Sequence, residues 1–364
     1  MMSTSFSFRH FPQLDGLRGL AILLVVAQHT LYCRFGVHTD LGGFGVALFF
    51  VLSGFLITGI LDSESGHTRG ISLSSFYTRR ALRLFPALFV FLAGICLLIR
   101  SKVVTDTPWY AVGACFLYVR NIWGRGSSTG HIWSLSLEEQ FYAWWPCIMK
   151  LFSRNIALRM AICGAVAITI FRMAAIHLNW LNYSTGVFYE RSWFRFDSPL
   201  MGCIIALCVF QTRHVSRWWA IASRSVAALV LWPCALAWVI WGESISRAWY
   251  ITVEMGLATL IVLNLVLSEE SYYLAIFRHP VSRWVGRISY SWYLWQQLFI
   301  LNAFAGSRLW TLPLLGASLA AAVVSYHVVE MPFLRLKERL GRQATGDRGH
   351  VKARLDCGAM SPAD

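Results

Sequence analysis

The stretch DGLRGLAILLVVAQH, residues 15–29, is typical of a helix that enters a membrane while carrying ionisable groups. Arg18 and His29 lie eleven positions apart, which is about three turns at 3.6 residues per turn. Their side chains therefore leave one face of the helix, roughly 16 Å apart along its axis. Because the apolar run continues past His29, we expect this residue at membrane depth, where an ionisable side chain usually lines a cavity or a relay. A structural histidine bonded to a neighbouring helix is the alternative.

The composition of the chain is that of a polytopic membrane protein. Of its 364 residues, 57% are hydrophobic and 14% are charged, and the mean hydropathy is +0.54, whereas soluble domains carry about 25% charged residues. The net charge of +14 does not indicate a nucleic acid as partner, because the basic residues fall in short loops between apolar runs. This is the distribution that places basic loops of membrane proteins in the cytoplasm.

The cysteines and histidines predict neither a disulfide framework nor a metal centre. The nine cysteines are scattered without a C-x-x-C pair, and the ten histidines show no i, i+4 pair and no H-E-x-x-H motif. The polar start lacks an apolar segment followed by a small-residue cleavage site. We therefore expect the first apolar run to be a retained helix rather than a signal peptide.

Eleven apolar runs approach the length of about 20 residues that a membrane-crossing helix requires. The runs are 17–34, 43–61, 82–99, 109–122, 132–151, 157–177, 196–211, 221–241, 249–267, 288–305 and 309–329. Placing the basic loops and the basic tail in the cytoplasm requires an even number of crossings between residues 82 and 151, where three runs occur. The shortest, 109–122, is expected to be re-entrant or interfacial. We predict an all-α membrane protein with about ten spans and both termini in the cytoplasm.

The chain is expected to form one domain with a tail. Residues 1–340 make the membrane-embedded domain, and residues 341–364 make a basic, disordered cytoplasmic tail. Residues 178–195 form the longest expected external loop. The charged residues near its end, Glu190, Arg191, Arg195 and Asp197, could contact a ligand, but we favour ordinary loop charges.

The second apolar run contains GFGVALFFVLSGFLIT, residues 43–58. Its small residues, among them Gly45 and Gly54, allow helix backbones to approach closely within a bilayer. Ser53 is not flanked as in the G-x-S-x-G nucleophile elbow, so we do not predict a serine nucleophile.

The segment FYTRRALRLFPA, residues 76–87, carries three arginines at the mouth of the third run. Arg80 and Arg83 are three apart and Arg79 and Arg83 are four apart, so a helix stacks the guanidinium groups on one side. Such a cluster suits phosphate, because arginine presents a planar fork of donors to anionic oxygens. The alternative is that these arginines only set the orientation of the helix in the membrane and contact lipid headgroups. We favour an anion site.

The segment HIWSLSLEEQFYAWWP, residues 131–146, places Glu138 and Glu139 in an apolar run. Ser134, Glu138 and Tyr142 are four apart and share a helix face. A buried carboxylate must be protonated, paired or hydrogen-bonded. Either glutamate could pair with an arginine of another helix, or a carboxylate could orient a histidine and raise its basicity.

The late segment GRISYSWYLWQQ, residues 286–297, is aromatic and amphipathic, with Gln296 and Gln297 inside the run. The two amides either line a pocket or satisfy hydrogen bonds between helices. Glu330, just before Pro332, closes the last run and is interpreted as a charge without function.

Taken in order, these motifs resemble the acyltransferase 3 family of integral-membrane O-acyltransferases. The matching stretches are LDGLRGLAILLVVAQH, GFGVALFFVLSGFLIT, RRALRLFP, HIWSLSLEEQFYAWWP and SYSWYLWQQ, and together they cover residues 12 to about 333. The resemblance implies transfer of an acyl group, commonly acetyl, from acyl-CoA to a hydroxyl of a carbohydrate or related acceptor. Acyl-CoA is then a co-substrate, and no permanently bound cofactor is expected.

The resemblance also implies the site residues. Arg18 and His29 match the family's Arg-x10-His pair, and Arg80 and Arg83 match its R-x-x-R. Glu138 matches the acidic residue of its S-L-x-x-E-x-Q-F-Y stretch. His29 is expected to be the general base on the acceptor hydroxyl, because an imidazole has a pKa near 7. A transient acyl-histidine is its alternative role.

The other predicted roles follow from the same comparison. Glu138 would orient or charge-balance His29 or Arg18, and Arg18 would stabilise a nearby acid or the thioester oxygen. Arg80 and Arg83, with Arg79, would hold the phosphates of CoA.

The sequence departs from the family pattern at two positions. The family often has Asp where this chain has Ala47, and His where it has Gln296. Neither Asp nor His can therefore be essential at those positions if the protein is active. Some members add a C-terminal esterase-like domain, which is not expected here, so the chain would deliver the acyl group itself or through a partner.

A second function class is a transporter or flippase for a lipid-linked glycan or small metabolite. Polar groups at membrane depth are compatible with it. Against it, the chain lacks the two-half repeat that is common in transporters. In either class we expect membrane lipids as partners and the bacterial cytoplasmic membrane as location. The acceptor and the acyl length stay open.

Overall fold

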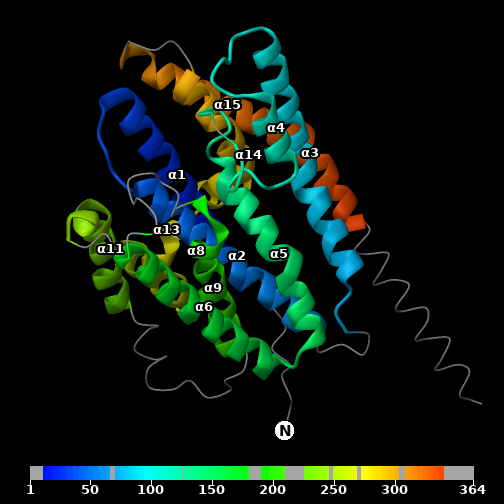
Figure 1. Cartoon of the computed structure of the whole chain (residues 1–364), viewed down its shortest axis with the longest axis vertical. Helices are drawn as coiled ribbons and strands as arrows, with labels where there is room; N and C mark the ends of the chain where they lie inside the picture. The colour runs from blue at the N-terminus through cyan, green and yellow to red at the C-terminus, as the bar shows by residue number, and fades with distance from the viewer. Residues whose placement is uncertain are drawn as a thin grey trace, which may run out of the picture.

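The computed structural model describes residues 11–65, 70–124, 126–178, 180, 190–209, 225–245, 249–268, 272–302 and 308–339. All regular secondary structure in these ranges is helical, as Figure 1 shows. The predicted all-α class is therefore confirmed. The predicted tail, residues 341–364, lies outside the described residues.

Each predicted apolar run contains a helix. In chain order the elements are α1 (Pro12–Phe35), α2 (Leu41–Ser65), α3 (Leu73–Arg100), α4 (Trp109–Phe116), α5 (Ile132–Leu151), α6 (Arg154–His177), α8 (Ser192–Arg195), α9 (Asp197–Val209), α11 (Ser225–Ile245), α12 (Tyr250–Leu267), α13 (Leu274–Arg278), α14 (Pro280–Asn302), η2 (Arg308–Trp310), α15 (Thr311–Val324) and η3 (Ser325–Glu330). A further helical stretch, residues 331–339, continues η3.

Six helices of the described chain are long and apolar enough to cross a membrane. They are α1, α2, α3, α6, α12 and the continuous helix Thr311–Arg339. Helix α9 and the 226–242 part of α11 are apolar but shorter. Helices α5 and α14 have 20 and 23 residues, but charged and amide side chains interrupt their apolar surfaces. Helix α4, with eight residues, is too short to cross about 30 Å of hydrocarbon.

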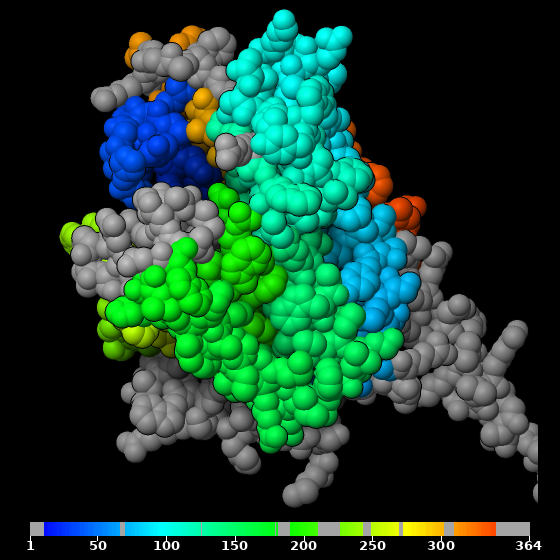
Figure 2. Space-filling view, in the orientation of Figure 1, coloured from blue at the N-terminus to red at the C-terminus, as the bar shows by residue number. Residues whose placement is uncertain are grey.

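Helix α1 makes long contacts with two neighbouring helices. It packs along α14 on one side and along α2 on the other, and α2 packs in turn along α9. Figure 1 shows α3 and the C-terminal helix side by side on one flank of the molecule. In the space-filling view of Figure 2, α4 and its loops cover one end and α6 lies toward the other.

Glycines allow these helices to cross at backbone contact distance. A Cβ on Gly54 of α2 would lie 1.9 Å from the carbonyl oxygen of Pro199, and one on Gly286 of α14 would lie 1.8 Å from that of Asp15. A Cβ on Gly45 would lie 2.5 Å from the carbonyl oxygen of Ala21. The close approach predicted from the small residues of the second run is thus confirmed at Gly45 and Gly54.

Replacing Gly54 by alanine is expected to destabilise the protein, because backbone rather than a flexible side chain occupies the space of the new methyl group. Overpacking of this kind costs about 1–3 kcal/mol of unfolding free energy. The matched control is Gly256→Ala on α12, where no atom lies within 4 Å of the added Cβ. Thermal unfolding in detergent, followed by tryptophan fluorescence, should show a loss for Gly54→Ala alone; equal effects of the two changes would contradict the close crossing.

Candidate active site

Three cavities follow one another through the helix bundle and share lining residues. The arginine cavity, of about 150 Å³, is lined by Arg18, Arg83 and Glu138 among others. The middle cavity, of about 50 Å³, shares Arg18 and Glu138 with it. The histidine cavity, of about 410 Å³, contains His29 and shares Val46 and Tyr293 with the middle cavity. The cavities therefore form a series beside α1, with Arg18 near one end and His29 at the other.

The sequence-predicted site residues all lie along this series. The arginine cavity brings together five of them, Arg18, Arg79, Arg80, Arg83 and Glu138, from three helices. His29 lines the histidine cavity. Arg18 and His29 both belong to α1, so helix geometry separates them by roughly 16 Å along its axis.

Two of the three clustered arginines are already paired with carboxylates. Arg79 lies 2.6 Å from Glu64, and Arg80 lies 2.6 Å from Glu139. Arg80 also stacks over the ring of Tyr142, with its guanidinium carbon 3.3 Å from the ring centroid. Of the two adjacent glutamates, Glu139 is thus the one that makes the arginine pair expected from the sequence.

Three other cations line the arginine cavity without an ion-pair partner in the described part of the chain. They are Arg18, Arg83 and Lys337. Their side chains form no hydrogen bond with another described residue, and together they give the cavity an excess of positive charge. The arrangement suits a multiply charged anion such as a phosphate ester. Lys337 was not predicted as a site residue, because its sequence looks like any basic segment that sets the orientation of a membrane protein.

Glu138 belongs to the arginine end of the series. Its carboxylate accepts a hydrogen bond from the Ser53 hydroxyl at 2.6 Å, and it lines the arginine and middle cavities together with Arg18. The structure therefore supplies the predicted neighbour Arg18. The alternative partnership with His29 is not seen, because His29 is bonded to a different residue.

Gln296 of α14 is the hydrogen-bond partner of His29 and fixes the orientation of its imidazole. The Nδ1 atom of His29 lies 3.0 Å from Gln296 Oε1, and Gln296 is fully buried. An amide oxygen only accepts, so in the neutral imidazole Nδ1 carries the hydrogen and Nε2 keeps its lone pair. The sequence left open whether Gln296 lines a pocket or bonds between helices; the structure shows a bond between α14 and α1.

Other ionisable side chains surround the histidine cavity. Its lining includes Asp40, Glu190 and His131. The Nε2 atom of His131 donates to the backbone carbonyl of Leu294 at 3.1 Å. Burial raises the pKa of the Glu190 carboxyl above its ordinary value, an effect that the nearby Arg120 and Arg191 oppose. This wall is polar, in contrast to the aromatic middle cavity.

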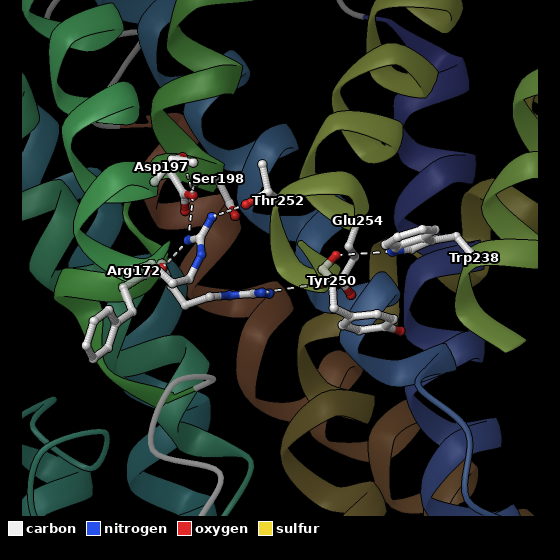
Figure 3. A network of polar contacts seen from close by, with 10 residues as sticks. Arg172, Asp197, Ser198, Trp238, Tyr250, Thr252 and Glu254 are labelled. Atoms are coloured by element: carbon white, nitrogen blue, oxygen red, sulfur yellow. Dashed lines mark hydrogen bonds and ion pairs between the residues drawn. The ribbon is translucent and has the colours of Figure 1, made fainter. Parts of the chain in front are cut away.

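Two fully buried ion pairs hold the segment that carries Glu190, as Figure 3 shows in part. Arg172 of α6 lies 2.7 Å from Asp197, and Arg195 lies 3.2 Å from Glu254 of α12. Arg172 also donates to the Thr252 hydroxyl at 2.8 Å. The four charged side chains have 0% exposure.

The interpretation of Arg195 and Asp197 as ordinary loop charges is therefore wrong. Both residues are buried in the bundle because side chains of opposite charge on α6 and α12 form ion pairs with them. The sequence held a signal for this: Arg172 and Glu254 are isolated charges within otherwise apolar runs, where an unpaired charge is costly.

The chain belongs to the acyltransferase 3 family. The family's profile, described as an acyltransferase domain, matches residues 11–328. Together with six helices suited to crossing a membrane, this match confirms the resemblance seen in the motifs and identifies an integral membrane protein of an acyltransferase family.

Two curated relatives carry more specific names. The peptidoglycan O-acetyltransferase OatA of Listeria monocytogenes serovar 1/2a is 27% identical over 366 residues, which covers 91% of this chain and 57% of the relative. The O-acetyltransferase OatA of Staphylococcus aureus strain NCTC 8325 is 26% identical over 361 residues, covering 90% of this chain and 58% of the relative. The chain spans a little over half the length of these relatives. No solved structure matches the chain.

Asp197→Asn is expected to destabilise the protein strongly, because it leaves the Arg172 guanidinium buried without its counter-charge. Breaking a buried pair in this way costs about 3–5 kcal/mol of unfolding free energy. The control is Asp62→Asn, which breaks the partly exposed pair with Arg154 at 3.1 Å and should cost less than about 1 kcal/mol. Denaturant unfolding in detergent measures both, and similar losses would contradict the role assigned to the buried network.

Proposed function

We propose that the chain transfers a short acyl group, acetyl in the first instance, from acyl-CoA to a hydroxyl of a carbohydrate acceptor. The observation that carries the proposal is the series of cavities. At one end lie cations that have no ion-pair partner among the described residues, and at the other lies an oriented imidazole. The names of the two relatives support acetyl as the group, and the name of the Listeria relative supports peptidoglycan as a candidate acceptor.

The donor's phosphates bind in the arginine cavity. Arg83 and Arg18 bind the phosphates through their guanidinium N–H groups. Arg79 and Arg80 contribute to the positive potential of the cavity although each is paired with a glutamate. Arginine forks bind phosphate oxygens at two points, so the cluster also sets the orientation of the donor. Acyl-CoA is consumed as a co-substrate and is not a resident cofactor.

The pantetheine arm runs from the arginine cavity toward His29. It passes the middle cavity, whose walls include Phe49, Phe50, Tyr290 and Tyr293. That cavity holds only about 50 Å³, so aromatic side chains move aside when the arm enters. Excluding water here protects the thioester from hydrolysis before the acceptor is in place.

His29 acts as the general base on the acceptor hydroxyl. Its Nε2 lone pair takes the proton as the hydroxyl oxygen forms a bond to the thioester carbonyl carbon. The carbon–sulfur bond then breaks, and the departing CoA thiolate takes up the proton. A transient acyl-imidazole at the same nitrogen is the alternative order of events.

Glu138 and Arg18 act at the donor end. Because roughly 16 Å of helix separates Arg18 from His29, we assign Arg18 to Glu138 and the phosphates rather than to the thioester oxygen. Glu138, hydrogen-bonded to Ser53, offsets the charge of Arg18 when no donor is bound.

We propose a topology of about ten spans in which α5, α9, α11 and α14 cross the bilayer alongside the six most apolar helices. Both termini, and with them the arginine cavity, then face the cytoplasm, where acyl-CoA is found. The basic loops support this orientation, and the membrane is the bacterial cytoplasmic membrane.

His29→Ala is expected to lower kcat for transfer by at least about 100-fold, the contribution of a general base, with little change in KM for acetyl-CoA. The assay uses purified protein, radiolabelled acetyl-CoA and soluble peptidoglycan fragments, and it measures free CoA and labelled glycan. The control, His177→Ala, alters an exposed histidine at the end of α6 and should retain full activity.

Two outcomes would contradict the proposal. A folded His29→Ala protein with full transfer activity would exclude the assigned base. Wild-type protein that releases no CoA from acetyl-CoA, with or without acceptor, would favour the transporter or flippase, for which the linked cavities would be a passage.

A further inference from the structure

The helical stretch that follows η3 adds a cation to the arginine cavity. Lys337 lines this cavity together with Arg79 and Arg83. It lies beyond residues 11–328, which the family profile matches. It has no ion-pair partner among the described residues.

A π-helical turn sets the position of Lys337. The turn, Ser325–Glu330, interrupts the helix just before Pro332. Proline has no N–H and would clash with the carbonyl of Val328 in a regular α-helix, and a π turn relieves this by adding a residue. The extra residue rotates the helical stretch that follows, 331–339, about its axis.

Contacts with α14 hold the π turn in place. The buried carboxylate of Glu330 accepts a hydrogen bond from the Ser291 hydroxyl, and the hydroxyls of Ser291 and Ser325 lie 3.1 Å apart. Lys337 follows Glu330 by seven residues, which is about 10 Å of helix at 1.5 Å per residue. The hydrogen-bonded Glu330 therefore fixes where the helical stretch that carries Lys337 begins.

Lys337 lines the arginine cavity on the side that the middle cavity does not share, as do Arg79, Arg80 and Arg83. Arg18 lines both the arginine and the middle cavity, whereas Lys337 lines the arginine cavity alone. In coenzyme A the pyrophosphate joins the pantetheine arm, and the 3′-phosphate lies on the ribose, farther from the thioester. With the thioester toward His29, the 3′-phosphate falls among the residues that line the arginine cavity alone. Of the cations in that set, Arg83 and Lys337 have no ion-pair partner among the described residues.

We propose that Lys337 binds the ribose 3′-phosphate of the acyl-CoA donor, so that the cavity distinguishes coenzyme A from its 3′-dephospho form. The assignment rests on the proposed function, because it takes acyl-CoA as the donor. An ammonium group suits a terminal phosphate monoester, which presents oxygens over a wide range of directions to a compact point charge. The phosphate of an anionic lipid headgroup offers the same chemistry.

Isothermal titration calorimetry on the full chain in phosphatidylcholine nanodiscs tests the assignment, with coenzyme A and 3′-dephospho-coenzyme A as probes. Lys337→Met should weaken coenzyme A binding about ten-fold, as expected for loss of a charge-assisted hydrogen bond. It should leave 3′-dephospho-coenzyme A within about two-fold of wild type. Lys337→Arg, which keeps the charge, should retain most of the preference.

The matched control is Arg335→Met, which removes one positive charge from an exposed position of the same helical stretch outside the cavity. It should change neither affinity by more than about two-fold, since an exposed charge is largely screened at physiological salt. Equal weakening of both nucleotides by Lys337→Met, or the same selective loss in Arg335→Met, would overturn the assignment.

The wild-type protein separates this assignment from the proposed function. Binding of both nucleotides with equal affinity would refute the role of Lys337 while leaving the donor class intact. Binding of neither nucleotide would refute acyl-CoA as donor and the assignment with it. Loss of coenzyme A selectivity only when anionic lipid is added would assign Lys337 to a lipid headgroup instead.

Discussion

The cost of placing charge inside an apolar bundle governs the arrangement of this protein. An ionised side chain without a partner is strongly disfavoured there, and the described chain meets this cost in two ways. Arg172, Asp197, Arg195 and Glu254 are fully buried and paired. Arg18, Arg83 and Lys337 have no such pairs and line a cavity instead. The contrast separates charges that hold helices together from charges available to a ligand.

Helix α1 connects these features. Glycine contacts hold it against α14 and α2 at backbone distance, and the same packing brings Gln296 of α14 to His29. The guanidinium of Arg18 and the imidazole of His29 thus lie on one helix, separated by roughly 16 Å along its axis. A rigid spacer of this kind suits a donor whose reactive thioester lies at the end of a long arm, because the positions of phosphate and carbonyl are set together.

The sequence predicted what lies within one helix better than what lies between helices. The shared face of Arg18 and His29 and the clustering of Arg80 with Arg83 follow from helical periodicity, and the structure places both as expected. Periodicity could not tell which of Glu138 and Glu139 meets an arginine, since adjacent residues point about 100° apart and the partner belongs to another helix.

Longer-range partners were harder to predict. The partnership of His29 with Gln296 joins residues 267 positions apart, and the burial of Arg195 and Asp197 depends on charges of α6 and α12. Lys337 reaches the cavity through a π turn, which no hydrophobic period reveals. The count of about ten spans stays a prediction: six helices of the described chain qualify on length and apolarity, whereas α5 and α14 carry polar groups that line the cavities.

The central claim is that donor and acceptor meet from opposite ends of one path through the bundle. Proteoliposomes with a single protein orientation test it most directly, with radiolabelled acetyl-CoA outside on the side of the arginine cavity and soluble peptidoglycan fragments sealed inside. The account predicts labelled glycan in the lumen while acetyl-CoA itself stays outside. Labelled glycan that forms only when both substrates are on the same side of the membrane would contradict it.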